Sequence, residues 1–273
     1  MDGGDDAAAL LKRAFGESSD EEGGQLGGPE ARGGREREEP PSRPSPRPTP
    51  RRGPTWAPVG EIDGLWLCGG FLSQEQQHSL LSAVEEEGWF MEASHNQAMR
   101  FGSLPAWATE LSNSIREAVL LGDFDPEFES SNADAYEDSS LFPILPLELL
   151  GREPLFDQLI VNLYRPGEGI CAHVDLMRFG DGIAIVSLES PCIMHFTRAG
   201  DTCDTGSEGE NEQPMSKVPV YLAPGSLVIM SGEARYLWKH EINRKPGFQV
   251  WQGQELDQRR RISITLRKLS IAE

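Results

Sequence analysis

The chain has 273 residues, which is enough for one sizeable domain or two small ones at roughly 150 residues per domain. Hydrophobic residues make up 38% and charged residues 25%, so part of the chain can bury a core. Lysine and arginine number 25 against 44 acidic residues, and the net charge of −19 excludes a protein that holds phosphates over its whole surface. A local basic groove is compatible with that total.

The acidic residues are concentrated in two segments, 122–138 with seven acids and no base and 200–212 with five acids and no base. The four cysteines are too far apart for a CxxC metal knuckle, and no secretory leader precedes them, which favours a reducing compartment. The apolar runs fall short of the roughly 20 residues of a membrane span. We therefore expect a soluble monomer without a membrane partner, located in the cytoplasm, the nucleus or both.

The N-terminal segment differs in composition from the rest. Residues 1–55 contain ten glycines, eight prolines and only ten apolar residues, which is too little apolar surface to offset the entropy of ordering. Residues 36–54 are rich in Arg, Pro and Ser and favour extended polyproline-like conformations. The sequence predicts a disordered tail over residues 1–55 and one folded domain over residues 56–273.

The folded part begins with helices and continues with short strands. Residues 64–72 resemble a strand that enters a turn, and Ser73 is placed to cap a helix with Leu80, Leu81 and Val84 on one face. A second helix is expected over residues 105–121. Turn signals such as Gly180-Asp-Gly182 separate the expected strands, which are residues 158–164, 183–189, 192–197, 218–222, 226–231 and 261–268. This order predicts an α+β fold in which the strands close into a double-sheet jelly roll.

One residue pair suggests a metal site. His173 and Asp175 form an H-x-D pair after a Gly-rich turn, and residues i and i+2 of an extended chain share one face. His240 is the natural third ligand from another strand. Two histidines and one carboxylate on one face leave open positions on the metal, a geometry that suits non-heme Fe(II) working on oxygen.

Two strands flank this pair with polar residues on one face. Asn162 and Tyr164 share a face of the preceding strand, and both can hydrogen-bond a carboxylate. Residues 261–267, Arg-Ile-Ser-Ile-Thr-Leu-Arg, alternate strictly between polar and apolar. Either this is a half-buried strand with solvated arginines, or Arg261 and Arg267 lie inside a barrel and require an anionic partner there.

Taken in order, Asn162-Leu-Tyr164, His173-Val-Asp175, His240 and Arg261-x-Ser-x-Thr-x-Arg267 resemble the AlkB-type 2-oxoglutarate/Fe(II) dioxygenases over roughly residues 62–270. Residues 165–170 and 230–240 are most similar to the branch that hydroxylates modified wobble uridines in tRNA.

The resemblance implies a double-stranded β-helix with Fe(II) held by His173, Asp175 and His240. It also implies a set of 2-oxoglutarate-binding residues, with Arg261 on the distal carboxylate and Ser263 as a further candidate: Asn162, Tyr164, Arg261, Ser263 and Arg267. The implied reaction consumes 2-oxoglutarate and O₂, releases succinate and CO₂, and oxidises a C–H bond of the substrate. An N-methyl group would leave as formaldehyde, whereas an oxidised carbon would keep its hydroxyl group.

Three further positions bear on the substrate and on the match to the family. Residues 94–102 occupy the place of the family's lid, where Arg100 could contact phosphate and Phe101 or His95 could stack on a base. Lys239, Arg244, Lys245 and residues 259–261 form a candidate basic cluster near the metal end. Glu241 stands where the family commonly has glycine, and it would be strained if that position requires positive φ.

The favoured hypothesis is a dioxygenase that acts on RNA, tRNA in particular, with an accessory RNA-binding protein as a candidate partner. A second hypothesis keeps the chemistry and replaces the substrate with alkylated DNA or a methylated protein side chain. A third is a non-catalytic adaptor barrel whose Arg/Pro-rich tail is the docking segment.

Overall fold

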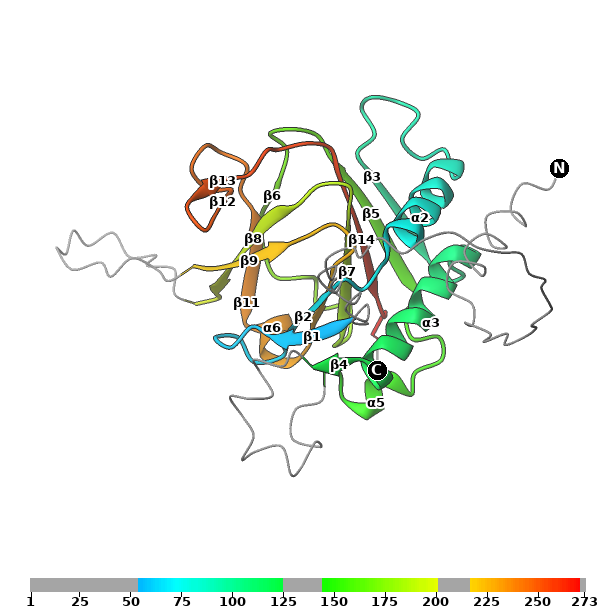
Figure 1. Cartoon of the computed structure of the whole chain (residues 1–273). Helices are drawn as coiled ribbons and strands as arrows, with labels where there is room; N and C mark the ends of the chain where they lie inside the picture. The colour runs from blue at the N-terminus through cyan, green and yellow to red at the C-terminus, as the bar shows by residue number, and fades with distance from the viewer. Residues whose placement is uncertain (1–53, 125–143, 201–216, 271–273) are drawn as a thin grey trace, which may run out of the picture.

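The computed structural model describes residues 54–124, 144–200 and 217–270. Two β-sheets face each other, and two helices cover the outer face of the larger sheet (Figure 1). The expected tail, residues 1–55, lies almost wholly outside the described residues, and so does most of both acidic segments. Within the described part of the chain, no helix is long and apolar enough to cross a membrane.

The larger sheet has eight strands, and all neighbours are antiparallel except β1 and β4. In spatial order they are β3 (Gln97–Phe101), β5 (Gln158–Tyr164), β14 (Arg261–Arg267), β7 (Ile183–Leu188), β10 (Leu227–Met230), β2 (Leu65–Gly69), β1 (Thr55–Pro58) and β4 (Asp123–Phe124).

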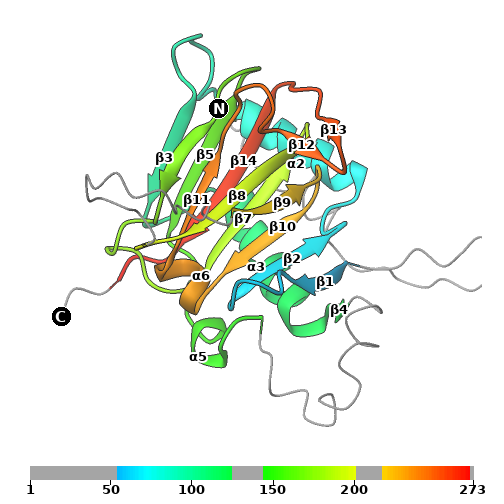
Figure 2. The ribbon, with the colours of Figure 1, turned by 90° about the vertical axis from the view of Figure 1, so that its left-hand side faces the viewer.

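The smaller sheet lies in front of the larger one in Figure 2. Its four strands are β6 (Ile170–His173), β11 (Trp238–Ile242), β8 (Cys192–Arg198) and β9 (Val218–Leu222), in that spatial order. A hairpin of β12 (Val250–Trp251) and β13 (Gln254–Glu255) and two short helices, α5 (Leu147–Leu150) and α6 (Gly232–Tyr236), complete the described elements. This is the α+β fold with a double-stranded β-helix core that the sequence predicts.

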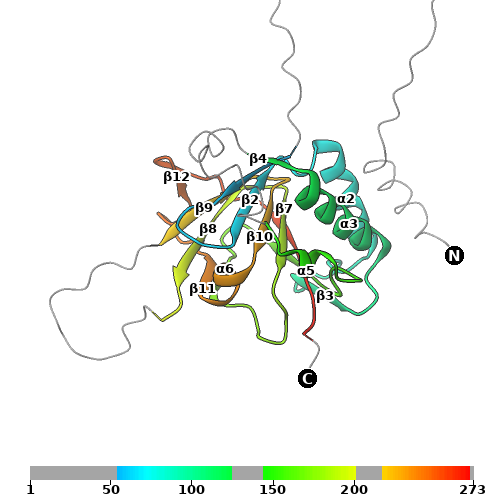
Figure 3. The same ribbon diagram turned by 90° about the horizontal axis from the view of Figure 1, so that it is seen from below.

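The helices α2 (Gln74–Glu86) and α3 (Ala106–Leu121) lie side by side on the larger sheet (Figure 3). Helix α2 begins where expected, because the Ser73 hydroxyl accepts a hydrogen bond from the Gln76 amide at 3.2 Å. The Gln76 side chain accepts one from the Ser73 amide at 2.8 Å in return, which completes a capping box.

The larger sheet is buried on both faces, and the two faces differ in chemistry. On β14, Ile262, Ile264 and Leu266 pack in the apolar layer beneath α2 and α3. Arg261 and Arg267 point the other way, between the two sheets, and they are 0% and 6% exposed. The alternation in residues 261–267 therefore separates an apolar core from a polar interior. This confirms that Arg261 and Arg267 lie inside the barrel rather than in solvent.

The six predicted strands agree with β5, β7, β8, β9, β10 and β14 to within one residue at each end. The sequence reading did not predict β1, β3, β6, β11, α5 or α6. His173 and His240 lie on β6 and β11, so the two strands that carry the candidate histidine ligands are among those that the sequence does not reveal.

Candidate metal centre and its pocket

A cavity of about 150 Å³ lies between the two sheets, and the three candidate metal ligands line it together with four of the expected 2-oxoglutarate residues. The apolar part of its wall includes Ile160, Ile185, Met194 and Ile242. Such a wall limits the access of water to the polar groups inside.

His173, Asp175 and His240 come together in this cavity. Their ligand atoms all lie within 4.8 Å of one another. His173 of β6 pairs directly with His240 of β11, and the ring centroids are 4.3 Å apart. The Nε2 atom of His240 is 3.7 Å from Oδ2 of Asp175. This is the two-histidine, one-carboxylate face that the sequence predicts.

The pairing of β6 with β11 depends on Gly169 just before β6. A Cβ atom at residue 169 would lie 1.9 Å from the carbonyl oxygen of Ile242, so only glycine allows this close approach. The Gly-rich turn is therefore required to bring His173 next to His240.

The two histidines are prepared differently for a metal. The Nδ1 atom of His173 is 2.8 Å from the Cys171 carbonyl oxygen, so with the proton on Nδ1 the Nε2 lone pair is available to an ion. Burial, and to a smaller extent the neighbouring His173, lower the pKa of His240 to about 4, against the opposing effect of Asp175. His240 is therefore neutral near pH 7, as a metal ligand must be.

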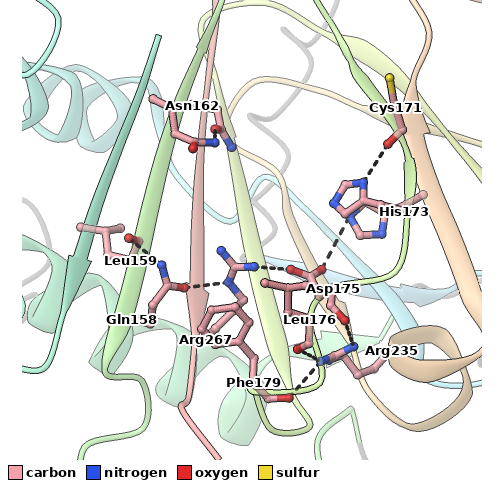
Figure 4. A network of polar contacts seen from close by, with 12 residues as sticks. Gln158, Leu159, Asn162, Cys171, His173, Asp175, Leu176, Phe179, Arg235 and Arg267 are labelled. Atoms are coloured by element: carbon pink, nitrogen blue, oxygen red, sulfur yellow. Dashed lines mark hydrogen bonds and ion pairs between the residues drawn. The ribbon is translucent and has the colours of Figure 1, made fainter. Parts of the chain in front are cut away.

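Arg267 holds the carboxylate of Asp175 in place (Figure 4). Its Nη1 atom donates to Oδ1 of Asp175, and its Nε atom donates to Oε1 of Gln158 at 2.7 Å. The guanidinium also lies over the ring of Phe179, 4.2 Å from its centroid. The guanidinium group of Arg267, on the larger sheet, thus orients the candidate metal ligand Asp175.

Arg235 fixes the backbone that follows the H-x-D pair (Figure 4), and the sequence reading gave it no role. Its guanidinium donates to the carbonyl oxygens of Asp175, Leu176 and Phe179 at 3.1, 2.9 and 2.9 Å. The side chain is 1% exposed. The sequence gives no signal for this role, because the partners of Arg235 are backbone carbonyl groups, which no sequence pattern displays.

The expected 2-oxoglutarate residues lie on two neighbouring strands, β5 and β14. Tyr164 pairs with Arg261, and Asn162 pairs with Ser263. Asn162 accepts a hydrogen bond from the Gln97 side chain at 2.7 Å. Ser263 hydrogen-bonds the Tyr164 side chain, whose pKa burial raises. The structure therefore brings Asn162, Tyr164, Arg261 and Ser263 together on the interior face.

Arg261 carries unused hydrogen-bond donors. Its Nη2 atom donates to the Ser187 hydroxyl at 2.9 Å, and its Cζ atom lies 5.4 Å from the centroid of the Tyr164 ring. Among the described residues, nothing accepts a hydrogen bond from its buried Nε and Nη1 atoms. A carboxylate is the group that such donors fit, so the residues present suit a dicarboxylate cosubstrate.

The structure separates the two candidate substrate residues, Arg100 and Phe101, which lie on opposite faces of β3. Phe101 pairs with Gln158 on the pocket side; its side chain is 47% exposed, with the Cζ atom of Arg178 5.6 Å from its ring centroid. Arg100 pairs with Leu159 on the side of the helices and stacks over Trp89 at 4.6 Å. Only Phe101 is brought to the pocket side.

The six residues of the candidate basic cluster near the metal end have different surroundings. Arg244 and Arg261 are buried, and Arg260 lies 3.4 Å from both Glu85 and Glu189. Arg259 pairs with Asp257 at 2.7 Å. Lys245 is exposed and Lys239 is half-buried. Four of the six cations are therefore buried or ion-paired, and a phosphate-attracting cluster at this place stays a prediction.

Glu241 is not strained. It lies within β11, paired with His195 in regular register, and it is not among the described non-glycine residues with positive φ. Its carboxylate accepts a hydrogen bond from the Lys217 ammonium at 2.5 Å. Glutamate in place of the family's glycine therefore changes only the outer face of β11 at this position.

Comparisons with known proteins agree with this geometry. Residues 64–267 match the family model described as the 2OG-Fe(II) oxygenase superfamily. The chain is 32% identical to an "Alkylated DNA repair protein ALKBH8 homolog" of Arabidopsis thaliana, over 76% of this chain and 59% of that protein. It is 30% identical to the "tRNA (carboxymethyluridine(34)-5-O)-methyltransferase alkbh8" of Xenopus tropicalis, over 70% of this chain and 27% of that protein.

A third relative is matched over most of its length. The "Alpha-ketoglutarate-dependent dioxygenase alkB homolog 7, mitochondrial" of Mus musculus is 28% identical, over 73% of this chain and 76% of that protein. By contrast, the chain spans less than two thirds of the plant and frog relatives. With the family model covering most of the folded part, the chain belongs to the 2OG-Fe(II) oxygenase superfamily and is a dioxygenase that uses Fe(II), 2-oxoglutarate and O₂.

Proposed function

We propose that this dioxygenase oxidises a C–H bond of a modified nucleoside in RNA, with tRNA as the first candidate. The observation that carries the proposal is the pair of Phe101 and Arg178 on the pocket side of β3. A half-exposed aromatic ring beside an exposed guanidinium offers a base a surface to stack on and its phosphate a positive charge. Two relatives whose names include tRNA support the same choice.

The chemistry of the proposal divides between the protein and what it binds. His173, Asp175 and His240 would hold Fe(II), and Arg261 with Tyr164 would hold 2-oxoglutarate. When bound, the iron and the cosubstrate supply the oxidation, in which 2-oxoglutarate, O₂ and R–H give succinate, CO₂ and R–OH.

The chain's own residues orient these groups. Arg267 aligns the carboxylate of Asp175, and Arg235 holds the backbone on which that carboxylate sits. The neutral imidazole of His240 is ready as a ligand without first losing a proton.

A second candidate substrate is an apolar protein segment. Met99, Leu176 and Met177 are 44%, 59% and 65% exposed, on the same strand as Phe101 and on the loop that follows Asp175. Exposed apolar side chains favour a peptide over a polyanion, and so does the net charge of −19.

Succinate formation tests both candidates. Anaerobic protein is loaded with Fe(II) and 2-oxoglutarate and exposed to O₂ with total tRNA, with alkylated single-stranded DNA, or with an unfolded protein mixture. The His173→Ala/Asp175→Ala variant is the background control. We expect tRNA to stimulate succinate most. Stimulation by protein alone would reject the RNA proposal and support the second candidate.

A variant of Phe101 tests the stacking surface. Phe101→Ala should lower kcat/KM for tRNA by about 10-fold or more, because base stacking on an aromatic side chain is worth about 1–3 kcal/mol. Succinate formed without added substrate should stay unchanged. Leu120→Ala is the matched control, since Leu120 is 56% exposed on α3, on the far side of the larger sheet. Equal effects of the two variants would contradict stacking at Phe101.

A further inference from the structure

Arg244 is a buried arginine whose guanidinium group has no hydrogen-bond partner within the described part of the chain. It lies two residues after the end of β11 and is only 6% exposed. Its backbone is held in place, because its carbonyl oxygen accepts a hydrogen bond from the Gln258 side chain at 3.2 Å. The backbone of Arg244 is thus held in place, and its side chain lies in the interior.

None of the three guanidinium nitrogens of Arg244 has a hydrogen-bond partner among the described residues. Leaving a buried cation unpaired costs several kcal/mol, so proteins normally provide an acceptor or use such a group to bind an anion. Burial lowers the pKa of Arg244, and the neighbouring Arg261 lowers it further, against raising effects of Cys192 and Tyr164. A guanidinium stays charged in proteins, so an anion is the partner that fits these free donors best.

The position of Arg244 identifies which anion. It interacts electrostatically with Arg261 and with Tyr164, and Arg261 also carries two buried nitrogens without a partner. Tyr164 lines the cavity that contains the candidate metal ligands. The two arginines together carry five unpartnered guanidinium nitrogens, and both interact with the one tyrosine, Tyr164, that lines this cavity.

We propose that Arg244 is a second binding residue for 2-oxoglutarate, and that Arg244 and Arg261 together clamp the carboxylate remote from the iron. The resemblance to the AlkB-type enzymes provides Arg261 alone for this carboxylate. Two guanidinium groups beside one carboxylate select strongly for a cosubstrate with a distal negative charge. The inference concerns the cosubstrate and holds whether RNA or protein is oxidised.

The test measures binding rather than turnover. The full chain is loaded with Mn(II) in place of Fe(II), and the Kd values of 2-oxoglutarate and of 2-oxopentanoate are measured by calorimetry. The second ligand keeps the oxo-acid end and replaces the distal carboxylate with a methyl group. Arg244→Met should raise the Kd of 2-oxoglutarate by about 10- to 100-fold, as for loss of hydrogen bonds to a charged group. The Kd of 2-oxopentanoate should stay unchanged.

Thermal unfolding separates a ligand-binding role from a structural one. Removing a buried cation without a partner should leave the melting temperature of the ligand-free protein unchanged or raise it. The upward shift that 2-oxoglutarate causes in the wild type should shrink in Arg244→Met. Arg259→Met is the matched control, since Arg259 is exposed and paired with Asp257, and it should alter neither quantity.

Two results would overturn the inference. One is an unchanged Kd of 2-oxoglutarate in Arg244→Met, and the other is an equal loss for both ligands, which would mean that the pocket itself has changed. If the methionine variant does not fold, Arg244→Lys decides, because it keeps the charge and loses the planar fork. A selective loss of 2-oxoglutarate affinity in that variant supports the clamp, and no loss overturns it.

Discussion

Asp175 is the residue on which most of the site converges. One carboxylate oxygen is bound by Arg267, the other lies 3.7 Å from His240, and its backbone carbonyl accepts a hydrogen bond from Arg235. Three elements distant in sequence therefore fix one carboxylate in position and direction. A metal ligand held in this way needs little reorganisation when an ion binds, and such outer contacts tune metal affinity.

Arg235 should be needed for both stability and metal affinity. In Arg235→Met, three buried carbonyl groups lose a charged donor, and we expect a loss of about 2–5 kcal/mol in the free energy of unfolding. The Mn(II) affinity should fall by about 10-fold or more, because the backbone of Asp175 is freed. Denaturant unfolding and metal titration at low temperature measure the two effects. Arg198→Met, which removes an exposed arginine paired with Glu233, is the control and should alter neither.

The buried imidazole of His240 predicts a pH dependence of stability in the metal-free protein. Its pKa is about 4 when folded and 6.5 as the ordinary value. Below about pH 6.5 the unfolded chain binds a proton that the folded protein does not, so stability falls as the pH drops from about 6.5 to about 4. The loss is at most about 3 kcal/mol at 1.36 kcal/mol per pKa unit.

Chemical unfolding at several pH values in the presence of a chelator checks this dependence. His240→Gln should show a flatter profile over the same window, since the variant has no imidazole to protonate. A profile of equal slope in the variant and the wild type would assign the dependence to other groups.

For single residues, the sequence predicts the candidate metal ligands but not the residues that hold those ligands in position. His173, Asp175 and the polar face of β5 and β14 follow from spacing and alternation, which are local properties. The role of Gln158 depends on its contact with Arg267, which lies 109 positions away in the sequence. The role of Arg235 depends on its contact with Asp175, which lies 60 positions away. Such contacts arise from the fold, and the residue types alone do not reveal them.

At the scale of elements, the most predictable strands were those with an apolar face and clear turn signals. β14 alternates strictly and β5 does so except at Ile160, because one face of each strand packs under the helices. β6 and β11 were missed because the first is only four residues long and the second carries Lys, His and Glu among five residues. β3 lies within residues 94–102, which the family resemblance implies as a lid, and its sequence has no clear strand signal.

The capping box of α2 predicts an effect on stability without an effect on chemistry. Ser73→Ala removes the acceptor for the Gln76 amide and should lower the free energy of unfolding by about 1 kcal/mol. The helix covers the outer face of the larger sheet, opposite the pocket, so the Kd of 2-oxoglutarate should not change. Ser79→Ala within the same helix is the matched control and should cost less. A change in 2-oxoglutarate affinity would show that α2 influences the interior.

At the scale of the whole molecule, the charge of the chain constrains how it can bind RNA. The net charge is −19, and four of the six residues of the expected basic cluster are buried or ion-paired. The exposed cation that the structure places on the pocket side is Arg178, beside Phe101. Recognition of RNA would then rest on the contacts around one base and on few phosphates.

Few phosphate contacts imply a weak dependence on salt. Each neutralised phosphate of a single strand contributes about −0.7 to the slope of log affinity against log salt concentration, so one or two contacts give a slope of about −0.7 to −1.4. The measurement is kcat/KM for tRNA between roughly 50 and 200 mM salt, and Arg178→Gln should make the slope shallower by about 0.7. A slope steeper than about −4 would mean that cations outside the described pocket rim hold the RNA, which would contradict recognition centred on Phe101 and Arg178.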